Sequence, residues 1–201
     1  LQKKALRGRY KKGMGRSALE KEIEQFIATL GVSYKTNVYT HSINELDILI
    51  PDYNLAIECN GDYWHSTKNK AKDFHINKTQ FCNKQGIQLI HVFECEWNNK
   101  QDIVKSIISA RLGKYAVKYR ADKANVTREP YSFEIRAFLN HNHIQGEYAH
   151  AQYCYCLRDK KTNQLMSCML FSKDTRNKKY PIVLSRFCSL LGYNIPYAAT
   201  R

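Results

Sequence analysis

The sequence predicts an α/β sandwich with a mixed central sheet flanked by helices, plus a smaller α+β domain. Two observations carry this prediction. Between residues 17 and 113, the pattern reads helix, three short strands, helix, apolar strand and helix. A basic, weakly periodic stretch at 114–130 then separates this region from a second set of elements.

The elements of the first domain are read in order. A helix begins at Ser17 and ends at Gly31, with apolar residues at helical spacing between them. Strands are expected over 33–40, 45–50 and 55–60, in an antiparallel meander with a turn at 51–54. A helix over 71–85, a central apolar strand over 87–94 and a helix over 102–113 complete this domain.

The remaining ranges have separate roles. Residues 1–16 are expected to form a basic arm, 17–113 the main domain, 114–130 a linker and 131–201 the small α+β domain. The last has a helix over 131–143, strands over 153–159 and 165–172, and a hairpin-like stretch after them. A start at Leu1 and a stop in mid-pattern suggest a fragment of a longer protein.

Charge and composition indicate the class of partner. The net charge is +14 and aromatic residues make up 12% of the chain, which favours nucleic acid over a membrane surface. No apolar run is long enough to span a bilayer, so a cytoplasmic protein is expected.

The seven cysteines fit the same compartment. Cys154 and Cys156, with His150 nearby, would suggest zinc. We expect the two thiols to point to opposite faces of a strand, so no structural zinc is predicted.

The N-terminal stretch is strongly basic and contains no acidic residue. It reads either as a solvated tail or as an arm that binds DNA phosphates. The DNA-contacting candidates in it are Lys3, Lys4, Arg7, Arg9, Lys11, Lys12 and Arg16.

Two acidic residues are predicted to meet at one end of the sheet. With the turn at 51–54, Ile48 faces Ile57 and Asp47 faces Glu58. Opposed carboxylates repel, so this register requires a shared proton or a cation. Oxygen ligands of this kind suit Mg²⁺, or Mn²⁺, and the chemistry such an ion serves is phosphate-ester cleavage.

Other polar residues are expected near this pair. Asn60 shares the face of Glu58, and His65 is a candidate to accept a proton from water. His75 and Lys78 share a helix face and could contact a phosphate. Each residue taken alone is more often an ordinary surface or packed side chain, but together they favour a site.

Glu20 has two readings. Its place on the core-facing edge of the first helix would let it join the site. The pattern Ser17-x-x-Glu20 is also a capping box, in which Glu20 only satisfies the helix start.

Five motifs in order carry a family resemblance: SALEKEI, ELDILI, IECNGDYWH, HINKT and GIQLIHVFECEW. They resemble the very-short-patch repair (Vsr) endonuclease and related phage homing endonucleases, a branch of the PD-(D/E)XK nuclease superfamily. The resemblance covers about residues 1–113. It implies a restriction-endonuclease-like core, Mg²⁺-dependent hydrolysis of double-stranded DNA, and an origin in a bacterial cell or phage.

The resemblance also implies roles for matching residues. Glu20 matches the glutamate of the first helix, and Asp47 matches the metal-binding aspartate. Cys59 falls where a backbone carbonyl binds the metal, and His65 falls on the histidine that activates water. Tyr63 and Trp64, together with the basic arm, fall in regions that contact DNA, where aromatic rings meet the base stack.

Several positions depart from the repair enzyme. Asn60 stands where that enzyme has a second histidine, and His75 or Lys78 stands where the family can place an aspartate. Of its structural zinc ligands only Cys95 remains, since Asp62 replaces another cysteine. These departures favour the phage homing branch over mismatch repair.

The second domain looks like the segment that accompanies such phage nucleases, and no catalysis is assigned to it. Its basic stretch either extends the DNA footprint or is an ordinary solvated surface. The residues concerned are Lys173, Arg176, Lys178, Lys179 and Arg186.

The expected function is therefore a Mg²⁺-dependent DNA endonuclease with a histidine general base. Two alternatives stay open: a DNA-binding module without activity, and an RNA-binding protein whose tyrosines stack on single strands. The sequence does not indicate a target site, one-strand or two-strand cleavage, or an oligomeric state.

Overall fold

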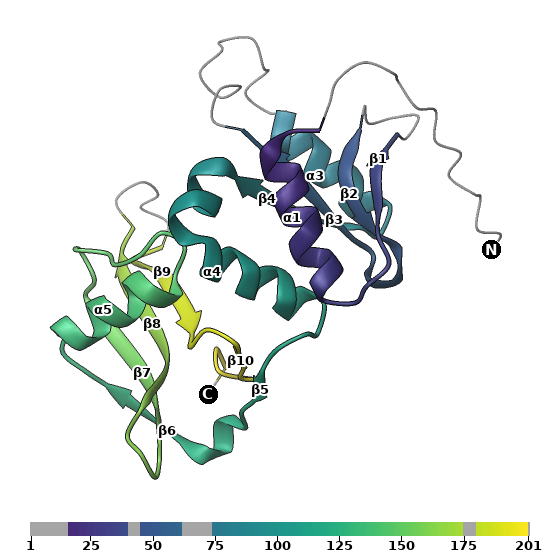
Figure 1. Cartoon of the computed structure of the whole chain (residues 1–201). Helices are drawn as coiled ribbons and strands as arrows, with labels where there is room; N and C mark the ends of the chain where they lie inside the picture. The colour runs from purple at the N-terminus through teal and green to yellow at the C-terminus, as the bar shows by residue number, and fades with distance from the viewer. Residues whose placement is uncertain (1–15, 40–44, 62–73, 175–179, 201) are drawn as a thin grey trace. The chain divides into compact units, whose positions relative to one another are not determined.

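The computed structural model describes residues 16–39, 45–61, 74–174 and 180–200 (Figure 1). The chain divides into two compact units, Leu1–Gln101 and Asp102–Arg201, and each unit has its own sheet. The division falls inside a helix, beside Lys100, whose φ of −137° and ψ of 36° are not helical. Within the described ranges, the structure holds no helix with the length and apolar character of a membrane span.

The first unit alternates helices and short strands. Its elements are α1 (Ala18–Thr29), β1 (Lys35–Val38), β2 (Leu46–Ile50), the 3-10 turn η1 (Pro51–Tyr53), β3 (Leu55–Asn60), α3 (Phe74–Lys84), β4 (Gln88–Phe93) and the start of α4 (Glu94–Arg111).

These strands form a mixed four-stranded sheet in the order β1-β2-β3-β4. The first three run antiparallel, and β3 and β4 run parallel, so the predicted meander and mixed sheet are confirmed. The register is also confirmed, because Ile48 pairs with Ile57. Asn54, with a φ of 47°, closes the turn that sets this register.

The prediction that 87–94 forms a central strand is wrong, because β4 is the last strand in this order. Its apolar run has another cause. Leu89 and Val92 are both buried although they point to opposite faces of the sheet. A strand buried on both faces is continuously apolar whether or not it has two neighbours.

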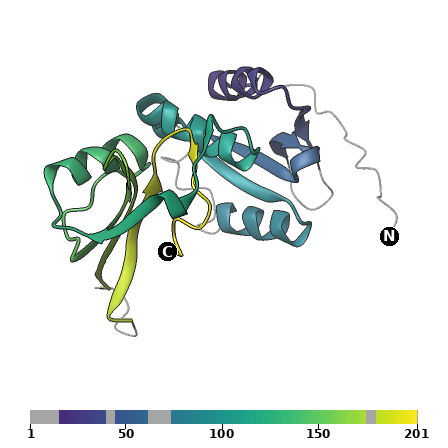
Figure 2. The same cartoon turned by 90° about the horizontal axis from the view of Figure 1, so that it is seen from below.

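Helices cover both faces of the first sheet (Figure 2). α1 buries a stripe of Leu19, Ile23 and Ile27, as the helical spacing predicts. On α3, Cys82 packs with Leu49 and Ala56 in an apolar cluster. Burying side chains of the size of Leu or Ile stabilises a fold by about 1.5–3 kcal/mol each. The polar residues discussed below are held at the edge of this core.

The second unit contains the end of α4 and an antiparallel sheet. Its other elements are β5 (Val117–Lys118), the 3-10 turn η2 (Ala121–Lys123), β6 (Ala124–Arg128), α5 (Phe133–Asn142), β7 (Tyr153–Asp159), β8 (Leu165–Lys173), β9 (Ile182–Ser189) and β10 (Tyr193–Asn194). The sheet order is β6-β7-β8-β9, and β5 pairs with β10 in a separate parallel ladder.

Residues 114–130 are not a simple linker. They contain β5 and β6, and β6 pairs along β7 from Ala124 opposite Asp159 to Arg128 opposite Tyr155. The strand was missed because it lies at the edge of the sheet and its sequence, ANVTR, is mostly polar. Pairing, not apolar patterning, places this segment in the second unit.

One face of the second sheet carries α5 and a cluster of thiols. Ile135 and Leu139 of α5 pack against Cys154, Cys156 and other buried residues. The expectation that these two thiols point to opposite faces is wrong, because residues two apart in a strand share a face. Their sulfur atoms lie 3.7 Å apart.

Candidate active site

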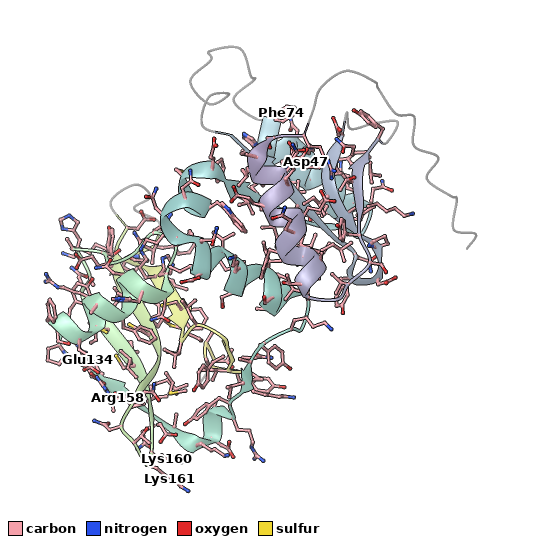
Figure 3. The ribbon with its side chains drawn as sticks, in the orientation of Figure 1. Asp47, Phe74, Glu134, Arg158, Lys160 and Lys161 are labelled. Carbon is pink, nitrogen blue, oxygen red and sulfur yellow. The ribbon has the colours of Figure 1, made fainter. Side chains whose placement is uncertain are left out.

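The candidate site begins with an acidic pair on β2 and β3. Asp47 precedes the pair of Ile48 and Ile57, and Glu58 follows it, so the two carboxylates lie on one face of the sheet. This is the face that α3 covers, as Ala56 and Cys82 show by packing together. Asp47 (Figure 3) also accepts a 2.7 Å hydrogen bond from the backbone N–H of Cys59. That bond holds the Asp47 carboxylate against β3.

A lysine from α3 meets this pair. Lys78 and Glu58 are both buried and form an ion pair through Nζ and Oε2. The Lys78 Nζ also lies 6.0 Å from the ring centroid of Phe74 (Figure 3). One ammonium group therefore faces two carboxylates in a region largely shielded from water.

Burial and charge repulsion act together on Asp47. Burial, with the Glu58 charge second, raises the pKa of Asp47 from 3.8 to about 7. The Cys59 hydrogen bond and the Lys78 charge act in the opposite direction but do not cancel this effect. Because one pKa unit corresponds to about 1.4 kcal/mol, ionised Asp47 is costly without further positive charge.

Glu20 takes part in the capping box that its spacing predicts. Ser17 Oγ donates to Glu20 Oε1 at 2.8 Å, and the Glu20 N–H donates back to Ser17 Oγ at 3.2 Å. The Glu20 charge also contributes to the raised pKa of Asp47, after burial and Glu58. Within the described ranges, Glu20, Asp47 and Glu58 do not form a closely spaced set of three ligands.

The two neighbouring glutamates of α1 are engaged elsewhere. Glu22 accepts a 2.7 Å hydrogen bond from the indole N–H of Trp97. Glu24 accepts a 3.1 Å hydrogen bond from the Tyr34 hydroxyl and pairs with Arg16. Of the three glutamates, Glu20 is the one whose charge acts on Asp47, as its position in the helix suggests.

His91 on β4 is a site residue that the sequence reading missed. It is the register partner of Glu58, and its Nε2 lies 2.9 Å from Thr79 Oγ1 on α3. Burial, with the His75 and Lys78 charges second and third, lowers the pKa of His91 to about 4, so the ring is neutral. The sequence feature that points to this residue is a histidine within the mostly apolar strand QLIHVF.

The partners of His91 fix its tautomer. The hydroxyl of Thr79 donates to the His75 carbonyl at 2.8 Å, so its oxygen accepts from His91 Nε2–H. The amide of Asn60 then donates to His91 Nδ1 at 3.4 Å, and to the Glu58 carbonyl at 3.3 Å. The network orients Asn60 beside the acidic pair.

The other predicted residues fall into two groups. His75 lies against aromatic rings, with its centroid 5.1 Å from that of His91. His65, Tyr63 and Trp64 lie outside the described residues, as does the basic arm apart from Arg16. The structure thus brings together Asp47, Glu58, Asn60 and Lys78, with the Cys59 N–H bound to Asp47.

The chain matches no protein-family model and no curated protein. Among solved structures, it is similar to the catalytic domain of the homing endonuclease I-Bth0305I, with a TM-score of 0.42 and 21% identity. The match covers 49% of this chain and 96% of that one. A likeness this distant establishes neither a shared fold nor a shared activity.

Proposed function

We propose that this protein is a Mg²⁺-dependent DNA endonuclease that hydrolyses a phosphodiester bond with water. The observation that supports this most strongly is the acidic pair of Asp47 and Glu58, which share the face of the sheet that Lys78 approaches. The net charge of +14 supports a polyanionic substrate. The family resemblance of residues 1–113 to homing and Vsr-like PD-(D/E)XK nucleases points to double-stranded DNA.

The charges of the site fit a divalent cation. Burial and the Glu58 charge raise the pKa of Asp47 to about 7, so added positive charge would stabilise its ionised form. Asp47 and Glu58 would hold Mg²⁺, or Mn²⁺, through carboxylate oxygens, with the carbonyl of Cys59 as a further ligand. When bound, such an ion polarises a phosphoryl oxygen and lowers the pKa of a water molecule.

The remaining residues have the following proposed roles. Lys78 offsets the charge of Glu58, because the two groups form a buried ion pair. His65 accepts the proton of the attacking water, and Glu20 positions that water. His75 or Lys78 steadies the phosphate, and Asn60 is held beside the acids by His91.

Duplex binding is proposed for the basic arm and two aromatic residues. Arg16 and the lysines and arginines before it would contact phosphates, which gives a salt-dependent affinity. Tyr63 and Trp64 would contact the base stack.

The test is cleavage of supercoiled plasmid by the full chain. Wild-type protein is incubated with Mg²⁺, with Mn²⁺ or with EDTA, and nicked and linear products are separated on a gel. Cleavage is expected with either metal and not with EDTA. Asp47→Ala should abolish it, whereas Asp52→Ala, at an exposed position in η1, should leave it unchanged.

Two outcomes would contradict the proposal. Tight duplex binding without cleavage in either metal would indicate a DNA-binding module that lacks activity. Preference for single-stranded RNA over duplex DNA would indicate an RNA-binding protein instead.

A further inference from the structure

A cluster of three thiols lies in the core of the second unit. Cys154 and Cys156 lie two residues apart on β7 and share a face of the sheet. Cys168 is the register partner of Cys156 on β8. All three side chains are buried. Cys154 Sγ lies 3.7 Å from the sulfur atoms of both other residues, and the three sulfurs lie within 4.8 Å of one another.

These separations match a zinc–thiolate centre. A Zn–S bond is about 2.3 Å long, so the sulfurs at neighbouring corners of a tetrahedron lie about 3.8 Å apart. The two measured Sγ–Sγ distances of 3.7 Å are within about 0.1 Å of that edge. Two of the three sulfur separations therefore already have the length of a tetrahedral edge, and the third is at most 4.8 Å.

A fourth thiol is within the same core. Cys188 on β9 is the register partner of Cys168, which puts its side chain on the same face of the sheet. It is buried in the same apolar cluster beneath Ile135 and Leu139. The register therefore places a fourth thiol on the face of the sheet that carries the other three.

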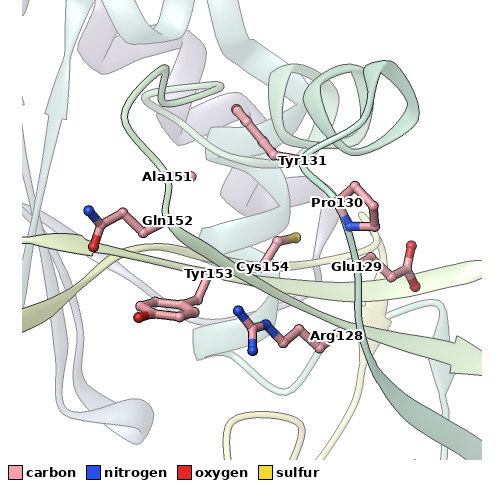
Figure 4. Close-up of a pocket in the computed structure, with 8 residues that line it drawn as sticks. All are labelled: Arg128, Glu129, Pro130, Tyr131, Ala151, Gln152, Tyr153 and Cys154. Carbon is pink, nitrogen blue, oxygen red and sulfur yellow. The ribbon is translucent and has the colours of Figure 1, made fainter.

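A cavity adjoins the cluster at Cys154. Cys154 lines a cavity of about 380 Å³ between the end of β6 and the start of β7 (Figure 4). Arg128, Tyr131 and Tyr153 are among its other lining residues.

We propose that Cys154, Cys156 and Cys168 bind one Zn²⁺ ion, with Cys188 as the fourth ligand. Four protein ligands close the coordination sphere, so the ion is structural and does not act in catalysis. Because its ligands come from β7, β8 and β9, it joins three neighbouring strands. The proposal does not depend on nuclease activity in the first unit.

The experiment measures metal in the full chain purified under reducing conditions with added Zn²⁺ and dialysed. Mass spectrometry of total metal should find one Zn²⁺ per chain. Replacement by Co²⁺ should give the visible bands of a tetrahedral site and the ultraviolet charge-transfer band of thiolate ligands. These readings use the wild type, so they do not depend on the folding of any variant.

Matched cysteine variants locate the ion. Cys154→Ser and Cys168→Ser should lose the bound metal, while Cys82→Ser, at a buried thiol of the first unit, should keep it. Cys188→Ser should weaken binding and reduce the charge-transfer band. Circular dichroism of each variant separates loss of metal from loss of fold.

The proposal is overturned if the wild type retains only trace metal and its Co²⁺ form shows no thiolate band, which would leave ordinary thiol packing. Full metal retention in both Cys154→Ser and Cys168→Ser would also overturn it. An unchanged cobalt spectrum in Cys188→Ser would remove Cys188 from the ligand set.

Discussion

Asp47 and Lys78 show how single side chains set the charge of the acidic pair. Asp47 is held by one backbone N–H and lies close to the Glu58 charge. Lys78 supplies the facing ammonium group from α3. Removing the Asp47 charge relieves its repulsion with Glu58, whereas removing the Lys78 charge leaves Glu58 without its ion-pair partner. Stability and activity can therefore both be tested at these two positions.

Replacing Asp47 with asparagine should stabilise the metal-free protein. The raised pKa of Asp47 means that folded protein keeps a proton between pH 3.8 and about 7 that unfolded protein has lost. Stability therefore falls as pH rises through this window, and Asp47→Asn removes the fall. Above pH 7 in EDTA, the free energy of unfolding should rise by roughly 1–3 kcal/mol.

Urea denaturation in EDTA at several pH values checks this prediction, with Asp52→Asn as the control. Plasmid cleavage should be lost in Asp47→Asn even though the variant is more stable. A pH-independent stability difference would contradict the repulsion on which the prediction rests.

Replacing Lys78 with methionine should destabilise the folded protein. The variant leaves the Glu58 carboxylate buried without its lysine, and breaking a buried ion pair in this way costs about 3–5 kcal/mol. Lys84→Met, at an exposed position at the end of α3, is the matched control. Thermal unfolding of both variants at neutral pH gives the comparison, and equal melting temperatures would refute a stabilising role for Lys78.

At the scale of elements, Arg158 connects β7 to α5 and to the segment that precedes it. Its guanidinium donates to Glu129 at 2.7 and 2.8 Å and to Glu134 at 2.8 and 3.0 Å. The Arg158 hydrogen bonds lower the pKa of both glutamates. The hydrogen bonds of the Arg158 guanidinium therefore hold the start of α5 against the sheet.

Arg158→Met should destabilise the second unit by about 2 kcal/mol at neutral pH, because several hydrogen bonds to charged groups are lost. Carboxylates with lowered pKa contribute stability above their usual pKa, and this contribution disappears as pH falls through the folded value. The difference from wild type should shrink in acid. Denaturation at neutral and acid pH measures it, and Arg136→Met, which removes a half-exposed arginine, is the control.

The elements differ in how far sequence predicts them. The apolar stripe of α1, the strand β3 and the β2–β3 register follow from local patterns, and the structure has them as expected. β6 has a mostly polar sequence, so only its pairing with β7 reveals it. The edge position of β4 depends on which strands pair across the sheet, and apolar content does not encode that.

The same distinction holds for the site. The Asp47 and Glu58 pairing follows from counting outward from a turn. The bond of Asn60 to His91 joins residues far apart in the chain, so it depends on the parallel pairing of β3 with β4. Contacts of that kind require the assembled sheet.

At the scale of the whole molecule, the two units should respond to different metal ions. Each has its own sheet and its own set of candidate ligands. An ion that binds only folded protein raises the stability of the unit that holds it. In calorimetry, Mg²⁺ should therefore move one unfolding transition and Zn²⁺ the other. The Asp47→Asn and Cys168→Ser variants assign the transitions, and a single transition that both ions shift together would contradict independent units.

The turn of Pro51–Tyr53 and Asn54 has a consequence for how this protein can change. The length of this turn sets the register between β2 and β3. Adding or deleting one residue there would therefore turn every following side chain of β3 to the other face of the sheet. Glu58 would then move to the face of the sheet that now carries Ile57, away from Asp47. Surface loops usually tolerate insertions, but an insertion of one residue in this short hairpin would separate Asp47 from Glu58.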